Sequence, residues 1–388
     1  MRPVAVVLLA AVLGAGCGGA PVLANPPITY PSPGAPASHP QRRPDPLPVE
    51  LPRDDGPHDR LTEWWYYTGH LQNEAGRRFG FEAVIFRGER GAVPTSWAAH
   101  LALTDEATGA FTYAQRSQVG PEVDRSPRDA DSAPTGFDLQ VAGLNPELVA
   151  AGGPAIGRAW RLAGSGGVDT IDAALTPEEA ASAGRSWGLS LGLEPTKPAA
   201  LHDGNGFVDF GPAGSSYYYS RTRLAATGEL QLDGERFAVE GIAWFDHQWG
   251  DFISVGGGWD WFAVNLDDET DLTLSVVRDA QGTPVLQYGT LVDPDGTARH
   301  LGAAAFEVRS LSSWTSSVSG HTYPVQWTIA LPAEDLAIEL TPTIEDQELD
   351  TRATTGVAYW EGSQVVRATR GGRPVEGEAY VEVTRYSE

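Results

Sequence analysis

Cysteine and lysine each occur only once in this chain of 388 residues, as Cys17 and Lys197. A lone cysteine leaves no partner for an intramolecular disulfide and excludes thiolate-based metal sites. Positive charge is scarce as well, because 27 Lys and Arg residues stand against 51 Asp and Glu residues, giving a formal net charge of -24. Nucleic acids and anionic membrane surfaces select basic patches. We therefore expect no nucleic-acid partner.

Several catalytic and cofactor motifs are also missing. The chain has no His-Glu-x-x-His pattern, and His70, His100 and His202 occur singly instead of at metal-ligand spacing. It has no Gly-x-Ser-x-Gly nucleophile elbow. Neither a phosphate-binding loop nor a dinucleotide fingerprint follows the N-terminal region. We expect no metal and no cofactor.

The first 24 residues have the composition of an export signal. Arg2 precedes an apolar run from Val4 to Leu13 that is too short to span a membrane, and Cys17 follows shortly after it. Cys17 resembles the lipid-modified cysteine of a bacterial lipoprotein, which would anchor the protein to a membrane. The alternative is ordinary cleavage after the small residue Ala24, giving a secreted protein. Residues 25–57 are rich in proline and predict an extended spacer.

Short runs of alternating or aromatic residues, separated by Gly, Asp, Asn and Pro, dominate the chain from Leu61 onward. This pattern predicts antiparallel strands. Thr176–Ala183 is the best helix candidate, with a capping threonine and proline at the first helical position. So many strands require closure to protect their edges. We predict an all-β protein with two tandem antiparallel β-barrels, at 58–230 and 231–388, with the boundary near Thr227–Asp233.

The densest group of chemically useful side chains lies between Gly241 and Phe262. It contains Asp246, His247 and Asp260 together with four tryptophans. The tryptophans are Trp244, Trp249, Trp259 and Trp261. Imidazole beside carboxylates suits proton transfer, and indole faces bind apolar or cationic groups. The alternative is structural, with His247 and Asp246 bonded across a turn and Asp260 bonded to the adjacent glycine loop.

Two other strands carry candidate ligand-binding residues. Strand alternation places Glu63, Trp65 and Tyr67 on one face, and it places Tyr217, Tyr219 and Arg221 on one face of a later strand. A glutamate between aromatic residues can line a ligand cavity, or it can lie at the rim of a hydrophobic strand. Arg221 is either a buried partner of Glu63 or Asp246, or a surface residue.

Several stretches together resemble one family. They are His58–Tyr66, Thr68–Leu71, Leu201–Phe207, Ser216–Arg221, Trp244–Gly250, Trp259–Phe262 and Tyr359–Gly362. They are similar to the AttH/carotenoid 1,2-hydratase family, which includes hydroxyneurosporene synthases and proteins described as predicted secreted hydrolases. The resemblance implies two tandem lipocalin-like (calycin) barrels and a large, apolar, unsaturated ligand. It also implies a role for the family's His-x-Trp element, which matches His247 and Trp249. The family's Tyr-x-Asp pair would fall within Leu272–Val277, which contains neither residue type.

Three functions follow as hypotheses. In the first, the protein hydrates or cyclises an isoprenoid, polyene or lipid. Asp246 or Asp260 then donates the proton, His247 orients water or relays the proton, and Trp249, Trp259 and Trp261 shape the cavity. In the second, the same aromatic residues bind a lipid that the protein only carries. The third is hydrolysis, for which the chain has no recognisable nucleophile.

Overall fold

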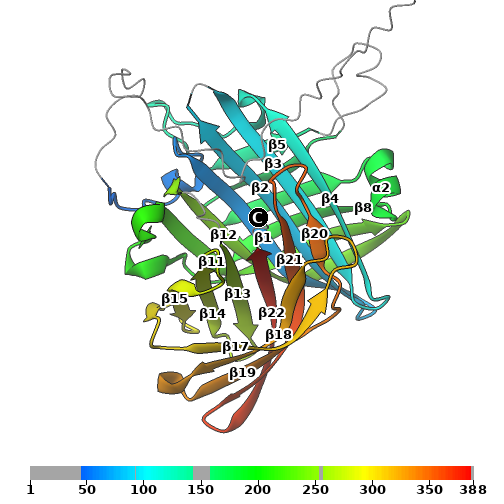
Figure 1. Cartoon of the computed structure of the whole chain (residues 1–388). Coiled ribbons are helices and arrows are strands. Elements are labelled where there is room, and N and C mark those ends of the chain that lie inside the picture. Colours follow the sequence, from blue (N-terminus) through cyan, green and yellow to red (C-terminus); the bar gives the residue numbers. More distant parts are fainter. Residues whose placement is uncertain (1–44, 92, 143–157, 253–256, 386–388) are drawn as a thin grey trace, which may run out of the picture.

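The computed structural model describes residues 45–91, 93–142, 158–252 and 257–385. Cys17, the export-signal region and residues 25–44 of the expected spacer lie outside these ranges. Within the described residues, no helix has the length and apolar character needed to cross a membrane. The chain forms two antiparallel sheets (Figure 1), which confirms the predicted all-β class.

The first sheet has 12 strands. Its main path runs, in spatial order, through β4 (Ala110–Val119), β3 (Val93–Asp105), β2 (Arg78–Arg90), β1 (Thr62–Asn73), β12 (Glu235–Phe252), β11 (Gly214–Leu232), β8 (Trp187–Pro195), β7 (Val168–Ala174), β6 (Trp160–Ser165) and β5 (Phe137–Val141). The short strands β9 (Ala200–Leu201) and β10 (Phe207–Asp209) pair with β11.

This first sheet curls into a nearly closed barrel, and side chains connect its two edge strands. Arg116 of β4 donates through Nη1 to the carbonyl of Val141 on β5 over 3.2 Å. Gln118 of β4 accepts a 2.9 Å hydrogen bond from the backbone N–H of Ala142. These bonds satisfy edge groups that would otherwise be open to pairing with another chain.

The second sheet has 10 strands and stays open. Its path runs through β16 (Ala298–Gly302), β15 (Pro284–Val292), β14 (Asp271–Arg278), β13 (Gly258–Leu266), β22 (Arg373–Arg385), β21 (Ala358–Arg370), β19 (Leu336–Pro342), β18 (Thr322–Leu331) and β17 (Glu307–Thr315), with β20 (Glu348–Asp350) paired to β21. Its two ends, β16 and β17, do not pair with each other, so this unit is a curled half-barrel.

Helical segments are short. The predicted helix is confirmed as α2 (Pro177–Ala183), where the Thr176 side chain and Glu179 form a reciprocal capping box. Five 3₁₀ turns complete the described elements: η1 (Arg53–Asp55), η2 (Pro121–Val123), η3 (His202–Gly204), η4 (Gly211–Ala213) and η5 (Pro332–Glu334).

The change from one sheet to the other lies C-terminal to the expected boundary at 230/231. That boundary falls at the end of β11, whose hairpin partner β12 pairs along its length with β11 and also with β1. Sheet membership changes between Phe252 and Gly258. The Gly-containing turn near Asp233 is therefore a hairpin inside the first sheet.

Residues 45–57 are packed against the first sheet, which corrects the expectation of a loose spacer for this part of the chain. Leu47, Val49 and Leu51 pack against the barrel core. Asp55 is fully buried and accepts hydrogen bonds from Arg221 Nη2 at 2.7 Å and from the Tyr219 hydroxyl. Arg221 therefore pairs with Asp55, a partner that the sequence did not suggest.

Candidate functional site

Strand β12 separates the predicted site residues into two environments. His247 and Trp249 face the interior of the first sheet, where Trp249 belongs to the hydrophobic core. Asp246 and Gln248 face the opposite way and line a cavity between the two sheets. Neighbours in a strand point to opposite faces. Asp246 and His247 therefore do not act together on one ligand in that cavity.

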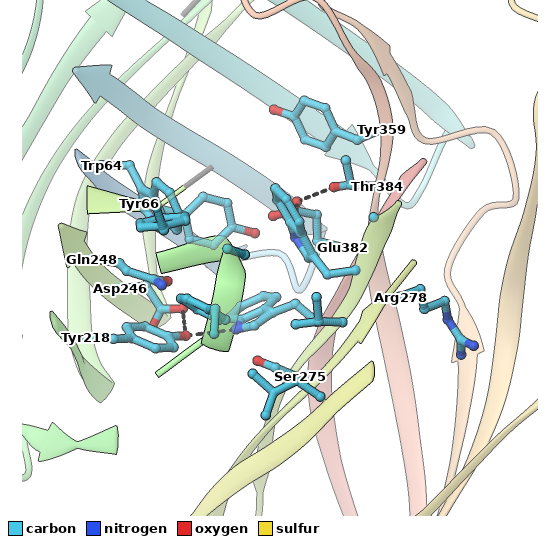
Figure 2. Close-up of a pocket in the computed structure, with 18 of the residues that line it drawn as sticks. Trp64, Tyr66, Tyr218, Asp246, Gln248, Ser275, Arg278, Tyr359, Glu382 and Thr384 are labelled. Atoms are coloured by element: carbon cyan, nitrogen blue, oxygen red, sulfur yellow. Dashed lines mark hydrogen bonds between the residues drawn. The ribbon is translucent and has the colours of Figure 1, made fainter. Parts of the chain in front are cut away.

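The cavity between the sheets has a volume of about 520 Å³ (Figure 2). Aromatic rings from both sheets form much of its wall: Trp64, Tyr66, Phe86 and Tyr218 from the first sheet, and Trp259, Trp261, Tyr288 and Tyr359 from the second. A volume of this size, with a mostly apolar wall and a few polar groups, is typical of a small-molecule site. The cavity therefore has the size and the wall of a site for an apolar small molecule.

Asp246 is one of the carboxyl groups that the first sheet places at this cavity, together with Glu82 and Asp209. Its side chain accepts hydrogen bonds from the hydroxyls of Tyr218 and Ser220 and a 2.6 Å bond from Trp244 Nε1. Burial raises the pKa of Asp246 to about 6, although these hydrogen bonds favour the carboxylate. Trp261 Nε1 donates to the Tyr218 hydroxyl over 3.1 Å and so connects this group to the second sheet.

Glu382 on β22 is the carboxyl group that the second sheet contributes to the cavity wall (Figure 2). Thr384 Oγ1 and Trp259 Nε1 each donate a 2.7 Å hydrogen bond to its Oε1. Burial raises the pKa of Glu382 to about 7, and the nearby Asp246 carboxylate adds to this rise. Asp246 and Glu382 therefore line one cavity from different sheets, and burial raises the pKa of both carboxyl groups toward neutrality.

Two further glutamates lie where the sheets meet, and one of them, Glu82 of β2, also lines the cavity. Glu82 accepts a 2.7 Å hydrogen bond from the Tyr359 hydroxyl, and burial raises its pKa to about 8. Glu361 accepts a 2.6 Å bond from the Tyr66 hydroxyl and lies opposite Glu382 in the β21–β22 ladder. Burial and the neighbouring carboxylates raise the pKa of Glu361 well above its ordinary value.

A second polar cluster lies inside the first sheet. Glu63 Oε1 is 2.7 Å from Nδ1 of His58 and 2.9 Å from Nε2 of His247. Burial opposes ionisation of Glu63, but the two imidazoles beside it outweigh this effect and lower the pKa of its carboxyl group to about 2. The ring of Trp249 stacks on His58 and that of Trp65 on His247. Imidazole and carboxylate are metal-ligand types, so these three residues are the described group that could hold an ion.

The remaining predicted site residues divide between these places. Trp259 and Trp261 line the cavity, and Trp244 lies behind Asp246. The others in the first sheet face its interior: Glu63, Trp65, Tyr217, Tyr219, His247 and Trp249. Asp260 is buried on the opposite face of β13 from Trp259 and Trp261, where it forms an ion pair with Arg278 at 2.7 Å.

Sequence reasoning missed Glu82, Glu361 and Glu382. A signal was present, since each of these glutamates directly follows an apolar or aromatic residue in its strand, namely Phe81, Trp360 and Val381. A carboxyl in such a place is costly unless it is paired, protonated or used. The His58–Glu63–His247 group carried no spacing signal, because His247 is far from the other two in sequence.

Comparisons with known proteins agree with this architecture. The AttH-like family matches residues 41–386. The crystal structure of an AttH from Nitrosomonas europaea is 30% identical, covers 88% of this chain and 98% of its own, and has a TM-score of 0.70. Kievitone hydratase from Nectria haematococca is 18% identical, covers 87% of this chain and 93% of its own, and has a TM-score of 0.60. CghA is 15% identical, covers 95% and 97% of the two chains, and has a TM-score of 0.53.

A comparison with proteins of curated function found no match. The two matches below 25% identity show a shared fold alone. The family match spans all of the described residues and includes both sheets. On that match, and on the 30% identity over almost the whole of a solved relative, this chain belongs to the AttH-like family.

Proposed function

We propose that this protein binds a large, apolar, unsaturated molecule in the cavity between the sheets and hydrates or cyclises it with acid assistance. The observation that carries the proposal is the pair of carboxyl groups, Asp246 and Glu382, that two different sheets place on the wall of one aromatic cavity. A hydratase shares this fold, which is consistent with the proposal.

The proposed reaction begins with transfer of a carboxyl proton to one carbon of a carbon–carbon double bond. The neighbouring carbon becomes a carbocation, which the faces of Trp259 and Trp261 stabilise. In hydration, water attacks this carbon and gives one proton to a carboxylate, so the net change is addition of H₂O. In cyclisation, a second double bond of the ligand attacks, and a carboxylate removes a proton from the product.

The reaction is tested with isoprenoid polyenes and prenylated phenols in ¹⁸O-labelled water, with products analysed by mass spectrometry. Hydration adds one labelled oxygen, and cyclisation gives an isomer of unchanged mass. Asp246→Asn and Glu382→Gln should abolish product formation while polyene binding, followed by quenching of tryptophan fluorescence, persists. Glu240→Gln is the matched control, because Glu240 lies on β12 but is exposed and outside the cavity.

A non-catalytic lipid carrier is the alternative outcome. Wild-type protein that binds polyenes and converts none of them would contradict catalysis and leave only binding. Loss of binding in Trp261→Ala would still assign the cavity as the site in that case. Turnover that persists in both Asp246→Asn and Glu382→Gln would show that neither carboxyl group takes part in the reaction.

The cellular location belongs to the same proposal. We propose that the protein is exported and attached to a membrane through a lipid on Cys17, which places the cavity near a source of apolar molecules. Metabolic labelling with a fatty-acid probe should mark the wild-type protein and leave Cys17→Ser unlabelled. Release of unlabelled wild-type protein into the medium would indicate ordinary signal cleavage instead.

A further inference from the structure

We propose that His58, Glu63 and His247 form a binding site for one divalent transition-metal ion, with Zn²⁺ as the best match. The three side chains come from the segment before β1, from β1 and from β12. Their donor atoms all lie within 4.8 Å of one another. A set of two imidazoles and one carboxylate is the ligand combination of many three-residue zinc sites.

The distances fit a common ion. Glu63 Oε1 lies 2.7 Å from His58 Nδ1 and 2.9 Å from His247 Nε2. Zinc bonds to nitrogen and carboxylate oxygen are about 2.0–2.2 Å long, so neighbouring donors in a tetrahedral site are separated by roughly 3.3 Å. Small outward shifts of these side chains would therefore place one ion between them, with a fourth position left for water.

The hydrogen-bond partners of the two imidazoles also fit a metal site. In metal sites, the ring nitrogen that does not bind the ion usually donates its N–H to a carboxylate or another acceptor. Here His58 Nε2 is 3.5 Å from Asp54 Oδ1, and His247 Nδ1 is 3.4 Å from the Tyr219 hydroxyl. With its proton on that outer nitrogen, each imidazole presents a lone pair toward Glu63. The other carboxylate oxygen, Glu63 Oε2, accepts a 2.9 Å bond from the His58 backbone N–H.

Packing fixes the rings before any ion binds. His58 stacks on Trp249 with ring centroids 4.0 Å apart and planes 2° from parallel, and His247 stacks on Trp65 at 4.7 Å. Glu63 and His247 are fully buried, whereas the His58 side chain is 20% exposed. An ion would therefore enter from the side of His58.

The donor types decide which ion fits. Two nitrogen donors favour Zn²⁺ and neighbouring transition metals over Mg²⁺ and Ca²⁺, which prefer oxygen. Arg87 Nη1 lies 3.9 Å from Glu63 Oε2, and its positive charge opposes binding of a cation. We therefore expect the site to bind its metal ion with moderate affinity. The site faces the barrel interior, opposite Asp246 across β12, so it is independent of the proposed reaction.

The test uses the full chain, freed of metal with a chelator. Titration calorimetry with ZnCl₂ should show one ion per chain, and elemental analysis after desalting should recover it. His58→Gln and Glu63→Gln should each weaken binding by more than 100-fold. Asp54→Asn, which changes only a group behind the donors, should weaken it by about 10- to 100-fold. His300→Ala, at an exposed histidine outside the cluster, is the matched control.

Two results would overturn the proposal. One is wild-type protein that binds less than about 0.1 equivalent of Zn²⁺, and the other is stoichiometric binding that survives in both His58→Gln and Glu63→Gln. If these variants do not fold, the wild-type protein loaded with Co²⁺ decides. An intense visible absorption band indicates a four- or five-coordinate ion held by the cluster, and the weak band of hydrated Co²⁺ rejects the site.

Discussion

The two faces of β12 place neighbouring residues in different chemical environments. On the inner face, His247 meets Glu63, and the imidazoles beside that buried carboxyl group lower its pKa. On the outer face, Asp246 shares the space between the sheets with other carboxyl groups and with no basic residue among its hydrogen-bond donors. The residues on the inner face of β12 stabilise a charged carboxylate, and those on the outer face favour protonated, neutral carboxyl groups.

The layer between the sheets also contains buried carboxyl oxygens that accept no hydrogen bond from the described residues. Among the described residues, Glu82 Oε2 and Glu361 Oε2 are buried without a hydrogen-bond partner, and both belong to the layer between the sheets. A protonated carboxyl carries one hydroxyl and tolerates such a place better than a carboxylate. The outer face of the first sheet is therefore where neutral acids are stable, which is what proton donation to an apolar ligand requires.

The largest expected effect comes from breaking the inner pair. In metal-free protein, His247→Ala should lower the free energy of unfolding by about 3–5 kcal/mol, because it leaves the buried Glu63 carboxylate with one fewer partner. Gln248→Ala, one residue away on the outer face, removes only the 2.8 Å hydrogen bond to Ser216 Oγ and should cost about 1 kcal/mol. Urea unfolding of both variants measures the difference. Equal losses would mean that the two faces of β12 are equally important for stability.

A smaller effect concerns protons in the outer layer. The pKa of Glu82 is raised to about 8 by burial, with a contribution from Glu382. Between its ordinary pKa near 4.5 and about pH 8, Glu82 is protonated in the folded state and ionised in the unfolded state. The stabilising contribution of Glu82 therefore falls as the pH rises through this range. Between pH 6.5 and pH 8, Glu82→Gln should remove up to about 2 kcal/mol of this pH dependence, because one group contributes at most about 1.4 kcal/mol per pH unit.

The measurement is urea unfolding of wild type and Glu82→Gln at both pH values. The other groups around Glu82 are the Tyr359 hydroxyl, which donates to it, and the carboxyls of Glu361 and Glu382. Glu82 raises the pKa of Glu361, so the difference between the two pH profiles reports Glu82 together with its effect on Glu361. Parallel profiles would show that Glu82 has the same proton affinity in the folded and unfolded chain.

Strand alternation predicted the faces of individual strands correctly. Trp65 and Tyr67 lie in the barrel core, and Trp64 and Tyr66 lie in the layer between the sheets. Alternation could not decide which face meets a ligand, because packing of the second sheet buries both faces of β1 and β12. Tyr66 is therefore as buried as a core residue although it faces outward from the barrel.

Features that depend on distant chain segments were beyond sequence reasoning. The pairing of Asp55 with Arg221 joins a proline-rich segment to β11, and no local pattern encodes it. Strand β17 is difficult to recognise in the sequence for a different reason. It forms an edge of the second sheet and is exposed at most positions, so it lacks the apolar alternation by which strands are recognised.

The smallest expected effect tests the aromatic residues on the two faces. Trp249→Phe keeps an aromatic ring over His58 but reduces the stacking area, and it should lower the free energy of unfolding by about 1 kcal/mol. Trp259→Phe removes an N–H donor from Glu382 at the cavity and should instead weaken polyene binding several-fold, measured by fluorescence quenching. If Trp249→Phe weakened polyene binding as much as Trp259→Phe does, the ligand would have to reach the barrel interior. It would then be wrong to assign ligand binding to the outer face of β12 alone.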